Sequence, residues 1–179
     1  MEHFDLYDVN RRFVGRQIRR GERLPKDLYH IVVHLCIFNG KGLLLIQRRR
    51  DDKEGFPGLW DLSVGGSALR GEVSLDAVKR EAMEELGFAV QGDPVPVMTM
   101  MFSEGFDDYY ICLSDVDLSD LVLQKEEVAE VRWASLEDVL ELIECGKFIP
   151  YRPDMMRLLW DMVSGDGAFS ASIPQFGRE

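Results

Sequence analysis

Three glutamates near the middle of the chain have the spacing of metal-binding side chains. Glu81, Glu84 and Glu85 fall within an arc of about 100° on a helical wheel, and Glu72 precedes them in a glycine-rich segment. Carboxylates on one helix face repel one another, so a purely structural helix gains nothing from them. A hard divalent cation removes the repulsion, because Mg²⁺ and Mn²⁺ prefer oxygen ligands. The alternative is an acidic helix face that only contacts solvent.

The segment around these glutamates is predicted to be a loop followed by a helix. Gly65, Gly66 and Gly71 indicate a tightly turning loop whose backbone can approach other groups closely. Ser74 has the side chain of an N-cap, and Gly87 can end the helix in the left-handed conformation. The helix is expected to pack on a sheet through its apolar residues, which are Leu75, Val78, Ala82 and Leu86.

The full spacing of this segment resembles the Nudix box, G-x5-E-x7-R-E-U-x-E-E-x-G-U, in which U is apolar. Every charged and glycine position of that pattern is matched, by Gly66, Glu72, Arg80, Glu81, Glu84, Glu85 and Gly87. Ala82 stands where a larger aliphatic residue is usual, a difference that concerns packing rather than chemistry. The chain therefore resembles the Nudix hydrolase superfamily, closely over the box and more loosely over residues 29–160.

This resemblance implies an α/β fold, namely a Nudix-type α/β/α sandwich around a mixed β-sheet. It also implies an activity, the hydrolysis of a diphosphate linkage in a nucleoside diphosphate joined to another moiety. The cofactor it implies is Mg²⁺ or Mn²⁺, and the partner is a small-molecule diphosphate substrate of the nucleotide class.

The resemblance also assigns roles to individual residues. The metal ligands it implies are Glu72, Glu81, Glu84, Glu85 and the backbone of Gly65. Glu84 is a candidate to take a proton from the attacking water, and Arg80 is expected to orient the helix glutamates by ion pairing. Glu127 is a candidate for one more catalytic carboxylate, although a solvated loop glutamate is the alternative interpretation.

Other residues are candidates for substrate contacts. Arg48 and Arg50 close a predicted strand, and their guanidinium groups match phosphate oxygens; the alternative is a solvated strand end. Phe102, Tyr109 and Tyr110 could stack a nucleobase, but aromatic residues at strand spacing favour a core position.

The chain divides into three predicted regions. Residues 1–28 form an N-terminal β-hairpin extension, residues 29–164 the Nudix hydrolase domain, and residues 165–179 a flexible tail rich in Gly, Ser and Ala. A two-stranded hairpin is marginal alone and must pack on something. It packs either on its own domain or on a second copy of the chain, and in the second case the protein is a homodimer.

Inside the domain, the apolar patterns predict strands and two further helices. Helices are expected to begin near Ser135 and Pro153. The expected strands are residues 29–38, 43–46, 61–64, 108–113 and 124–133, with one or two more in residues 89–101.

Composition narrows the class of protein. The 179-residue chain is 46% apolar and has a formal net charge of −11, which argues against general nucleic-acid binding. There is no apolar run long enough for a membrane span, and no signal peptide is recognised. Three cysteines without paired metal spacing, Cys36, Cys112 and Cys145, indicate reduced thiols and a cytoplasmic location.

Two rival functions remain open at this point. Residues 30–39, 56–60 and 63–66 also resemble isopentenyl-diphosphate isomerase, a Nudix relative that protonates a carbon–carbon double bond. That enzyme needs a cysteine at the position of Gly65 and a histidine at that of Ser67, and neither is present. The second rival is a non-catalytic nucleotide-binding Nudix domain, but such domains usually lose box glutamates, whereas this chain keeps all of them.

Overall fold

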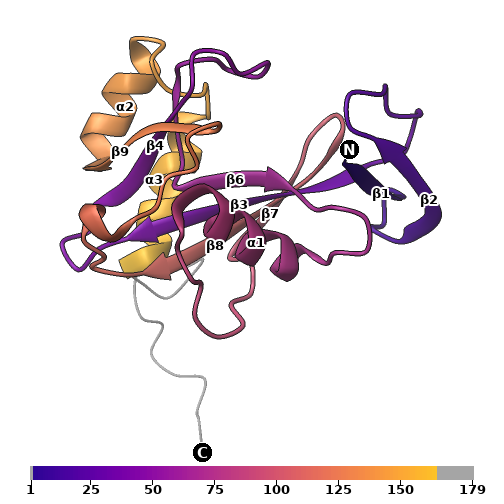
Figure 1. The fold of residues 1–179 in the computed structure, drawn as a ribbon, viewed down its shortest axis with the longest axis horizontal. Helices are drawn as coiled ribbons and strands as arrows, with labels where there is room; N and C mark the ends of the chain where they lie inside the picture. The colour runs from indigo at the N-terminus through magenta and orange to yellow at the C-terminus, as the bar shows by residue number, and fades with distance from the viewer. Residues whose placement is uncertain (1, 165–179) are drawn as a thin grey trace, which may run out of the picture.

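A mixed β-sheet forms the middle layer of the protein, and helices cover both of its faces (Figure 1). The structure is a computed structural model that describes residues 2–164. Over that range, seven strands form the sheet and two more form a separate hairpin. The strands are β1 (His3–Tyr7), β2 (Phe13–Arg19), β3 (His30–Phe38), β4 (Leu44–Arg49), β5 (Trp60–Asp61), β6 (Val64–Ser67), β7 (Met98–Met101), β8 (Gly105–Leu113) and β9 (Val128–Ala134). The helices are α1 (Ser74–Leu86), α2 (Leu136–Glu144), α3 (Pro153–Ser164) and the short 3₁₀ helix η1 (Leu118–Asp120).

The sheet is built around β3. This strand pairs in parallel with β8 along its whole length, from His30 opposite Gly105 to Phe38 opposite Leu113. It pairs antiparallel with β6 and, at its end, with β4. β4 continues the sheet to β5 and β9, and β7 lies beside β8 at the other edge. A strand covered on both faces needs a nearly continuous apolar sequence, and β3 has one.

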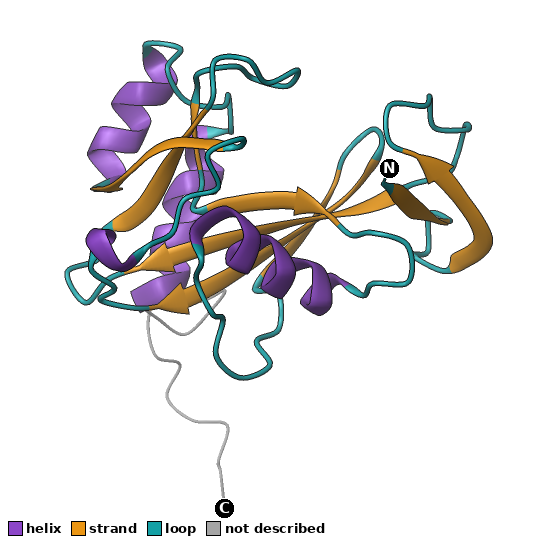
Figure 2. Cartoon of the chain, in the orientation of Figure 1, coloured by secondary structure: helices purple, strands orange, loops and turns teal. Residues whose placement is uncertain are grey.

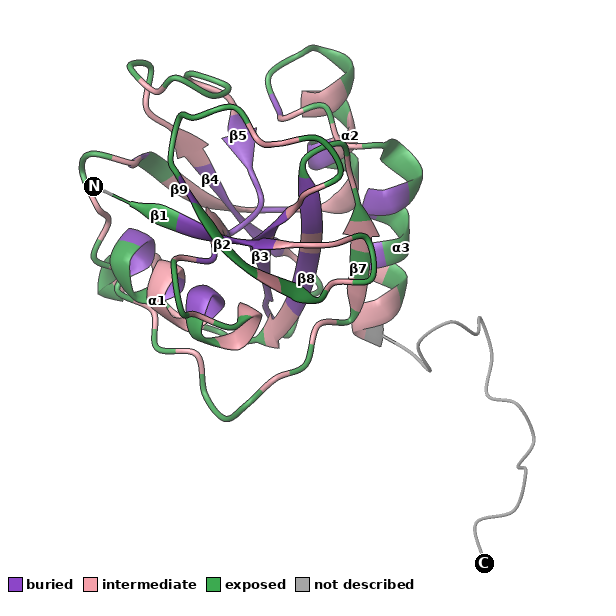
Figure 3. Cartoon of the chain, turned by 90° about the vertical axis from the view of Figure 1, so that its right-hand side faces the viewer, coloured by how far each residue is buried: buried purple, intermediate pink, exposed green. Residues whose placement is uncertain are grey.

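One apolar cluster lies on each face of the sheet. On one face, α1 contributes Ala77, Val78 and Leu86, all fully buried. On the other face, α2 and α3 contribute residues such as Val139 and Leu159. Figure 3 shows the buried residues concentrated in the central strands and on the inner sides of the helices. The predicted α/β/α sandwich with a mixed sheet is therefore confirmed.

The ends of the helices correct one detail of the sequence analysis. Gly87 ends α1 in the left-handed conformation (φ 63°), as expected. The N-cap is Val73, which makes no side-chain capping bond, so the prediction of Ser74 as N-cap was wrong. Ser74 is the first helical residue, and its hydroxyl instead donates to buried Asp108. At α2, Ser135 caps the helix and forms a capping box with Asp138.

Two strand predictions also need correction. Within residues 89–101, only 98–101 form a strand, because Pro94 and Pro96 leave the preceding segment without ladder bonds. The segment predicted as one strand over residues 61–64 is divided between β5 and β6. The tail predicted over residues 165–179 lies outside the described residues. No helix in the described part of the chain has the length and apolar character needed to cross a membrane.

The N-terminal hairpin of β1 and β2 lies at the opposite end of the sheet from α2 (Figure 2). Tyr7 exchanges two backbone hydrogen bonds with Tyr29, and Phe4 stacks on His30 with ring centroids 5.2 Å apart. The hairpin also holds the loop before α1. The Arg70 N–H donates to the His3 carbonyl (2.7 Å), and the Gly71 N–H donates to Asp5 Oδ2 (2.8 Å).

The turn of the hairpin is tied to the sheet by a buried ion pair. Arg11 donates through both terminal nitrogens to Asp108, which is fully buried on β8. Thr99 and Ser74 also donate to the Asp108 carboxylate. A buried charge with these partners is stable, but the loss of its counter-charge leaves an uncompensated carboxylate in the interior. The hairpin thus packs on its own domain.

This ion pair predicts the effect of a substitution in the turn. Arg11→Ala is expected to lower the free energy of unfolding by about 3 kcal/mol, because Asp108 stays buried without its cation. The measurement is urea unfolding at pH 7. Arg12→Ala, in the same turn but exposed, is the matched control and should change stability by no more than about 0.5 kcal/mol. Equal effects of the two variants would contradict this role of Arg11.

Candidate active site

The predicted glutamates of α1 line a small polar cavity of about 100 Å³. Gly65 and Gly66 of β6 also line this cavity. Residues from four separate segments complete it. The lining residues are Glu2, Arg20, Arg49, Gly65, Gly66, Arg80, Glu81, Glu84, Glu85, Gln124 and Glu127. The fold therefore brings together Glu81, Glu84, Glu85, Gly65, Arg80 and Glu127, which the sequence had assigned to one site.

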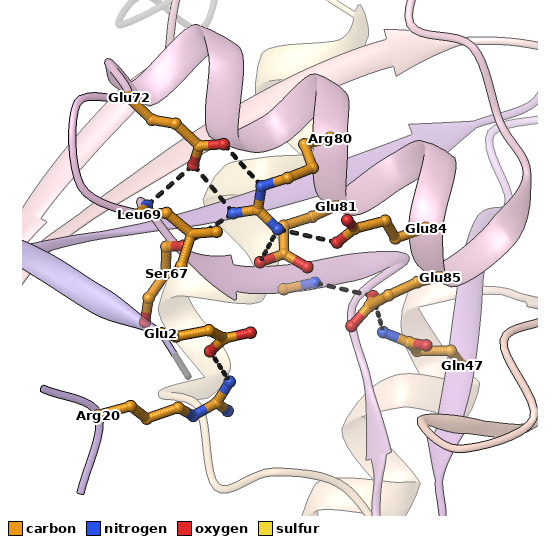
Figure 4. A network of polar contacts seen from close by, with 11 residues as sticks. Glu2, Arg20, Gln47, Ser67, Leu69, Glu72, Arg80, Glu81, Glu84 and Glu85 are labelled. Atoms are coloured by element: carbon orange, nitrogen blue, oxygen red, sulfur yellow. Dashed lines mark hydrogen bonds and ion pairs between the residues drawn. The ribbon is translucent and has the colours of Figure 1, made fainter.

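Arg80 is the centre of the polar network beside this cavity (Figure 4). Its Nη1 lies 2.9 Å from both Glu81 Oε1 and Glu84 Oε2. Its Nε donates to Glu72 Oε1 (2.7 Å), and its Nη2 donates to the Ser67 carbonyl (3.1 Å) and to Glu72 Oε2 (3.0 Å). One guanidinium thus connects three carboxylates to the loop.

Glu72 does not line the small cavity. Its carboxylate accepts from the Leu69 N–H (2.8 Å) as well as from Arg80. Burial raises the pKa of Glu72, but the hydrogen bonds from Arg80 and Leu69 outweigh this and hold the pKa below its usual value. In this conformation Glu72 therefore fixes the loop and Arg80.

Burial has the opposite result for two of the helix glutamates. It raises the pKa of Glu85 to about 8, although Gln47 Nε2 donates to this carboxylate (2.9 Å). It raises the pKa of Glu81 to about 7, although Arg80 favours the charged form. The negative charge of Glu81 adds to the increase at Glu85. Two carboxylates that resist ionisation side by side form a region where a cation would be strongly stabilised.

Gly66 is required by the space beside Glu81. A Cβ at this position would overlap the Glu81 carboxylate, so only glycine leaves that side chain where it lies. The glycine pair of β6 thus forms a wall without side chains, and the Glu81 carboxylate rests against it.

A larger cavity of about 560 Å³ adjoins the small one. Both cavities are lined by Gly65, Gly66 and Arg49, which we call the shared wall. Phe102 lines the larger cavity, whereas Tyr109 and Tyr110 are buried, as their spacing had favoured.

Arg49 was missed by the sequence analysis. Arg48 instead contacts Asp51 and Glu130, and Arg50 contacts Asp52, so neither lines these two cavities. The alternation of side chains along a strand could have identified Arg49. Gln47 and Arg49 are two apart and share a face, and Gln47 contacts Glu85.

The donor set of the small cavity fits a hard divalent cation. It consists of carboxylate oxygens. Gln47 does not line the cavity but contacts Glu85, and its Oε1 is a buried acceptor without a partner. Among residues 2–164, no group of three or more His, Cys, Asp or Glu side chains is already arranged to hold a metal. Arg80 and Gln47 engage the carboxylates instead, and Glu127 lies 2.5 Å from Lys53 Nζ.

Comparisons with known proteins agree with this site. The sequence model of the NUDIX domain family matches residues 28–158. The chain is 50% identical over 152 residues to an uncharacterized Nudix hydrolase of Listeria monocytogenes, covering 84% of this chain and 90% of that protein. It is 34% identical over 141 residues to the uncharacterized Nudix hydrolase YfcD of Salmonella typhi, covering 76% and 71%. The solved structure of DR0079 from Deinococcus radiodurans has a TM-score of 0.74 at 27% identity, covering 87% and 98%.

The chain therefore belongs to the Nudix family. Within that family it is a Nudix hydrolase, an enzyme that cleaves phosphoric anhydrides. Hydrolases of this kind act on small-molecule substrates linked to nucleoside diphosphates and generally use divalent metal ions. The comparisons do not confirm the resemblance to isopentenyl-diphosphate isomerase.

The raised pKa of Glu85 predicts how pH changes the stability of the metal-free protein. A carboxyl group whose pKa rises on folding stabilises the fold below its unfolded value of 4.5, and this contribution is lost as pH rises toward 8. Wild type should therefore lose on the order of 3 kcal/mol relative to Glu85→Gln between pH 5 and pH 8. Urea unfolding in EDTA at both values measures this. A constant difference between the two proteins would contradict it.

The absence of a side chain at Gly66 predicts that this position affects metal binding. Gly66→Ala should displace the flexible Glu81 carboxylate and weaken Mn²⁺ binding at least about tenfold, with little change in melting temperature. Titration calorimetry with Mn²⁺ measures the affinity. Gly55→Ala is the matched control, because its added Cβ would meet only Arg49 at an ordinary 4.0 Å. Unchanged Mn²⁺ affinity in Gly66→Ala would show that this clearance is not needed.

Proposed function

We propose that this chain is a hydrolase dependent on Mg²⁺ or Mn²⁺ that cleaves the diphosphate linkage of a nucleoside diphosphate joined to another moiety. The observation that carries the proposal is the pair of adjoining cavities, one acidic and small, the other larger and mostly apolar. A diphosphate at the shared wall would lie beside the carboxylates, with an organic group in the larger cavity. A substrate of this class needs both environments.

The metal ligands in this proposal are Glu81, Glu84, Glu85, Glu72 and the backbone of Gly65. Glu72 joins them only if its bonds to Arg80 rearrange, since it does not face the cavity here. A divalent cation, when bound, neutralises a diphosphate and makes water a better nucleophile at neutral pH. The carboxylates of this chain supply the oxygen atoms that such a cation prefers.

Side chains around the cavity divide the remaining work. Glu84 is half exposed and can accept the proton of the attacking water, and Glu127 is the second candidate for this role. Arg80 positions the glutamates. Arg49 and Arg20 are cations that line the small cavity and can contact phosphate oxygens. Excess negative charge on the phosphates in the transition state would be stabilised by such cations.

The direct test follows cleavage by phosphorus NMR. Wild type with Mg²⁺ is expected to cleave a nucleotide sugar at its diphosphate, and Glu85→Gln should reduce kcat by at least about a hundredfold at an unchanged fold. Isopentenyl diphosphate in the same series tests the isomerase. Tight nucleotide binding without any cleavage would instead support the non-catalytic Nudix domain and overturn the proposal.

The same assay tests which of the three arginines at the end of β4 contacts the substrate. Arg49→Ala should raise KM or lower kcat about tenfold through the loss of a phosphate contact. Arg48→Ala and Arg50→Ala are the matched variants, and they test the sequence-based prediction that these two residues bind substrate. Equal losses in all three variants would contradict the selection of Arg49 by its position.

A further inference from the structure

The larger cavity has two kinds of wall. Phe56, Phe102, Ile149 and Pro150 give it apolar surface, and they come from separate segments of the chain. Phe56 is 49% exposed, so its ring is accessible from solvent. The polar lining includes His34, Asp61 and Asp107. The volume of about 560 Å³ lies within the usual range of small-molecule sites.

His34 is held in place but lacks one hydrogen bond. Its ring stacks on Tyr109 with centroids 4.7 Å apart and meets the Tyr151 ring edge-on. The residue is only 8% exposed, and its Nδ1 has no partner. A Cβ placed on Gly65 would lie 3.2 Å from Nδ1, so this nitrogen faces the shared wall. A buried polar atom without a partner is costly.

Three polar side chains of this cavity, His34, Asp61 and Asp107, offer hydrogen-bond acceptors, while the guanidinium donors lie at the shared wall on Arg49. His34 Nε2 lies 3.5 Å from Asp107 Oδ1, and in the neutral tautomer that carries its proton on Nε2 the Nδ1 atom is an acceptor. Asp107 is the most accessible of them, with 21% of its side chain exposed. Asp61 is nearly buried, and its Oδ1 accepts from Tyr151 (2.9 Å) and from the Leu62 N–H (2.7 Å). The part of the cavity formed by these three residues therefore suits a ligand group that donates hydrogen bonds.

Nucleobases differ in this respect. Adenine, cytosine and guanine each carry an exocyclic amino group, whereas uracil carries none and presents two carbonyl oxygens on either side of one ring N–H. A carboxylate accepts from an amino group and repels a carbonyl oxygen. Planar bases also match the aromatic surfaces of Phe102 and Phe56.

We propose that the larger cavity is a nucleobase site that selects amino-bearing bases, with Asp107 as the residue that determines specificity. This inference rests on the proposed function, because it places the nucleoside end of the diphosphate in this cavity. Asp107 would accept a hydrogen bond from the amino group of the base, while the diphosphate extends across the shared wall. The apolar residues then enclose the ring and exclude water from that hydrogen bond.

The test compares ADP-glucose, GDP-glucose, CDP-glucose and UDP-glucose, which differ only in the base. Wild type should show kcat/KM values for the first three that are at least about tenfold above the value for UDP-glucose. Asp107→Asn should reduce that ratio about tenfold, because an amide can donate to the carbonyl oxygen of uracil. Glu104→Gln is the matched control, since it removes an exposed charge from the turn just before β8 and does not line the cavity.

The outcomes separate the two proposals. If no nucleotide sugar is cleaved, the proposed function fails, and calorimetric titration with AMP, CMP, GMP and UMP still tests the base site. Weaker binding of UMP than of the other three would support it, and equal or absent binding would overturn it. If wild type cleaves all four sugars equally, or Asp107→Asn slows all of them by one factor, the hydrolase stands and the base site is rejected.

Discussion

The ion pairs of Arg80 are the interaction on which the rest of the site depends. Several carboxylates at the end of one helix would repel one another, and the fold would pay for holding them together. A single guanidinium with five donors in a rigid fork can bind Glu72, Glu81 and Glu84 at once, and it also reaches the Ser67 carbonyl. The loop, the helix and β6 are thereby fixed relative to one another before any cation binds.

β3 connects the N-terminal hairpin to the larger cavity. At the start of β3, His30 stacks on Phe4 of the hairpin. Four residues further along the strand, His34 lines the larger cavity. The strand pairs in parallel with β8. Asp107 and Asp108 are successive residues of β8, so their side chains point to opposite faces of the sheet. Asp107 therefore lines the cavity, while Asp108 receives the hairpin arginine on the opposite face.

Much of this could be predicted from the sequence, because the box is a local pattern. Its spacing placed the glutamates on one helix and Gly87 at the end of that helix. Contacts between distant segments could not be predicted in the same way. Arg11 and Asp108 are 97 residues apart, and no periodicity indicates that they meet. Arg49, by contrast, could have been predicted. The alternation of β4 places it on the same face as Gln47, which contacts Glu85 of the box.

The backbone bonds between the hairpin and the loop before α1 have a consequence for motion. The amides of Arg70 and Gly71 are bonded to His3 and Asp5, so this part of the loop cannot open without separating from β1. Regions that must separate together behave as one cooperative unit, with a common opening free energy. Opening of the loop before α1 is thus coupled to detachment of the hairpin, which lies outside the family match of residues 28–158.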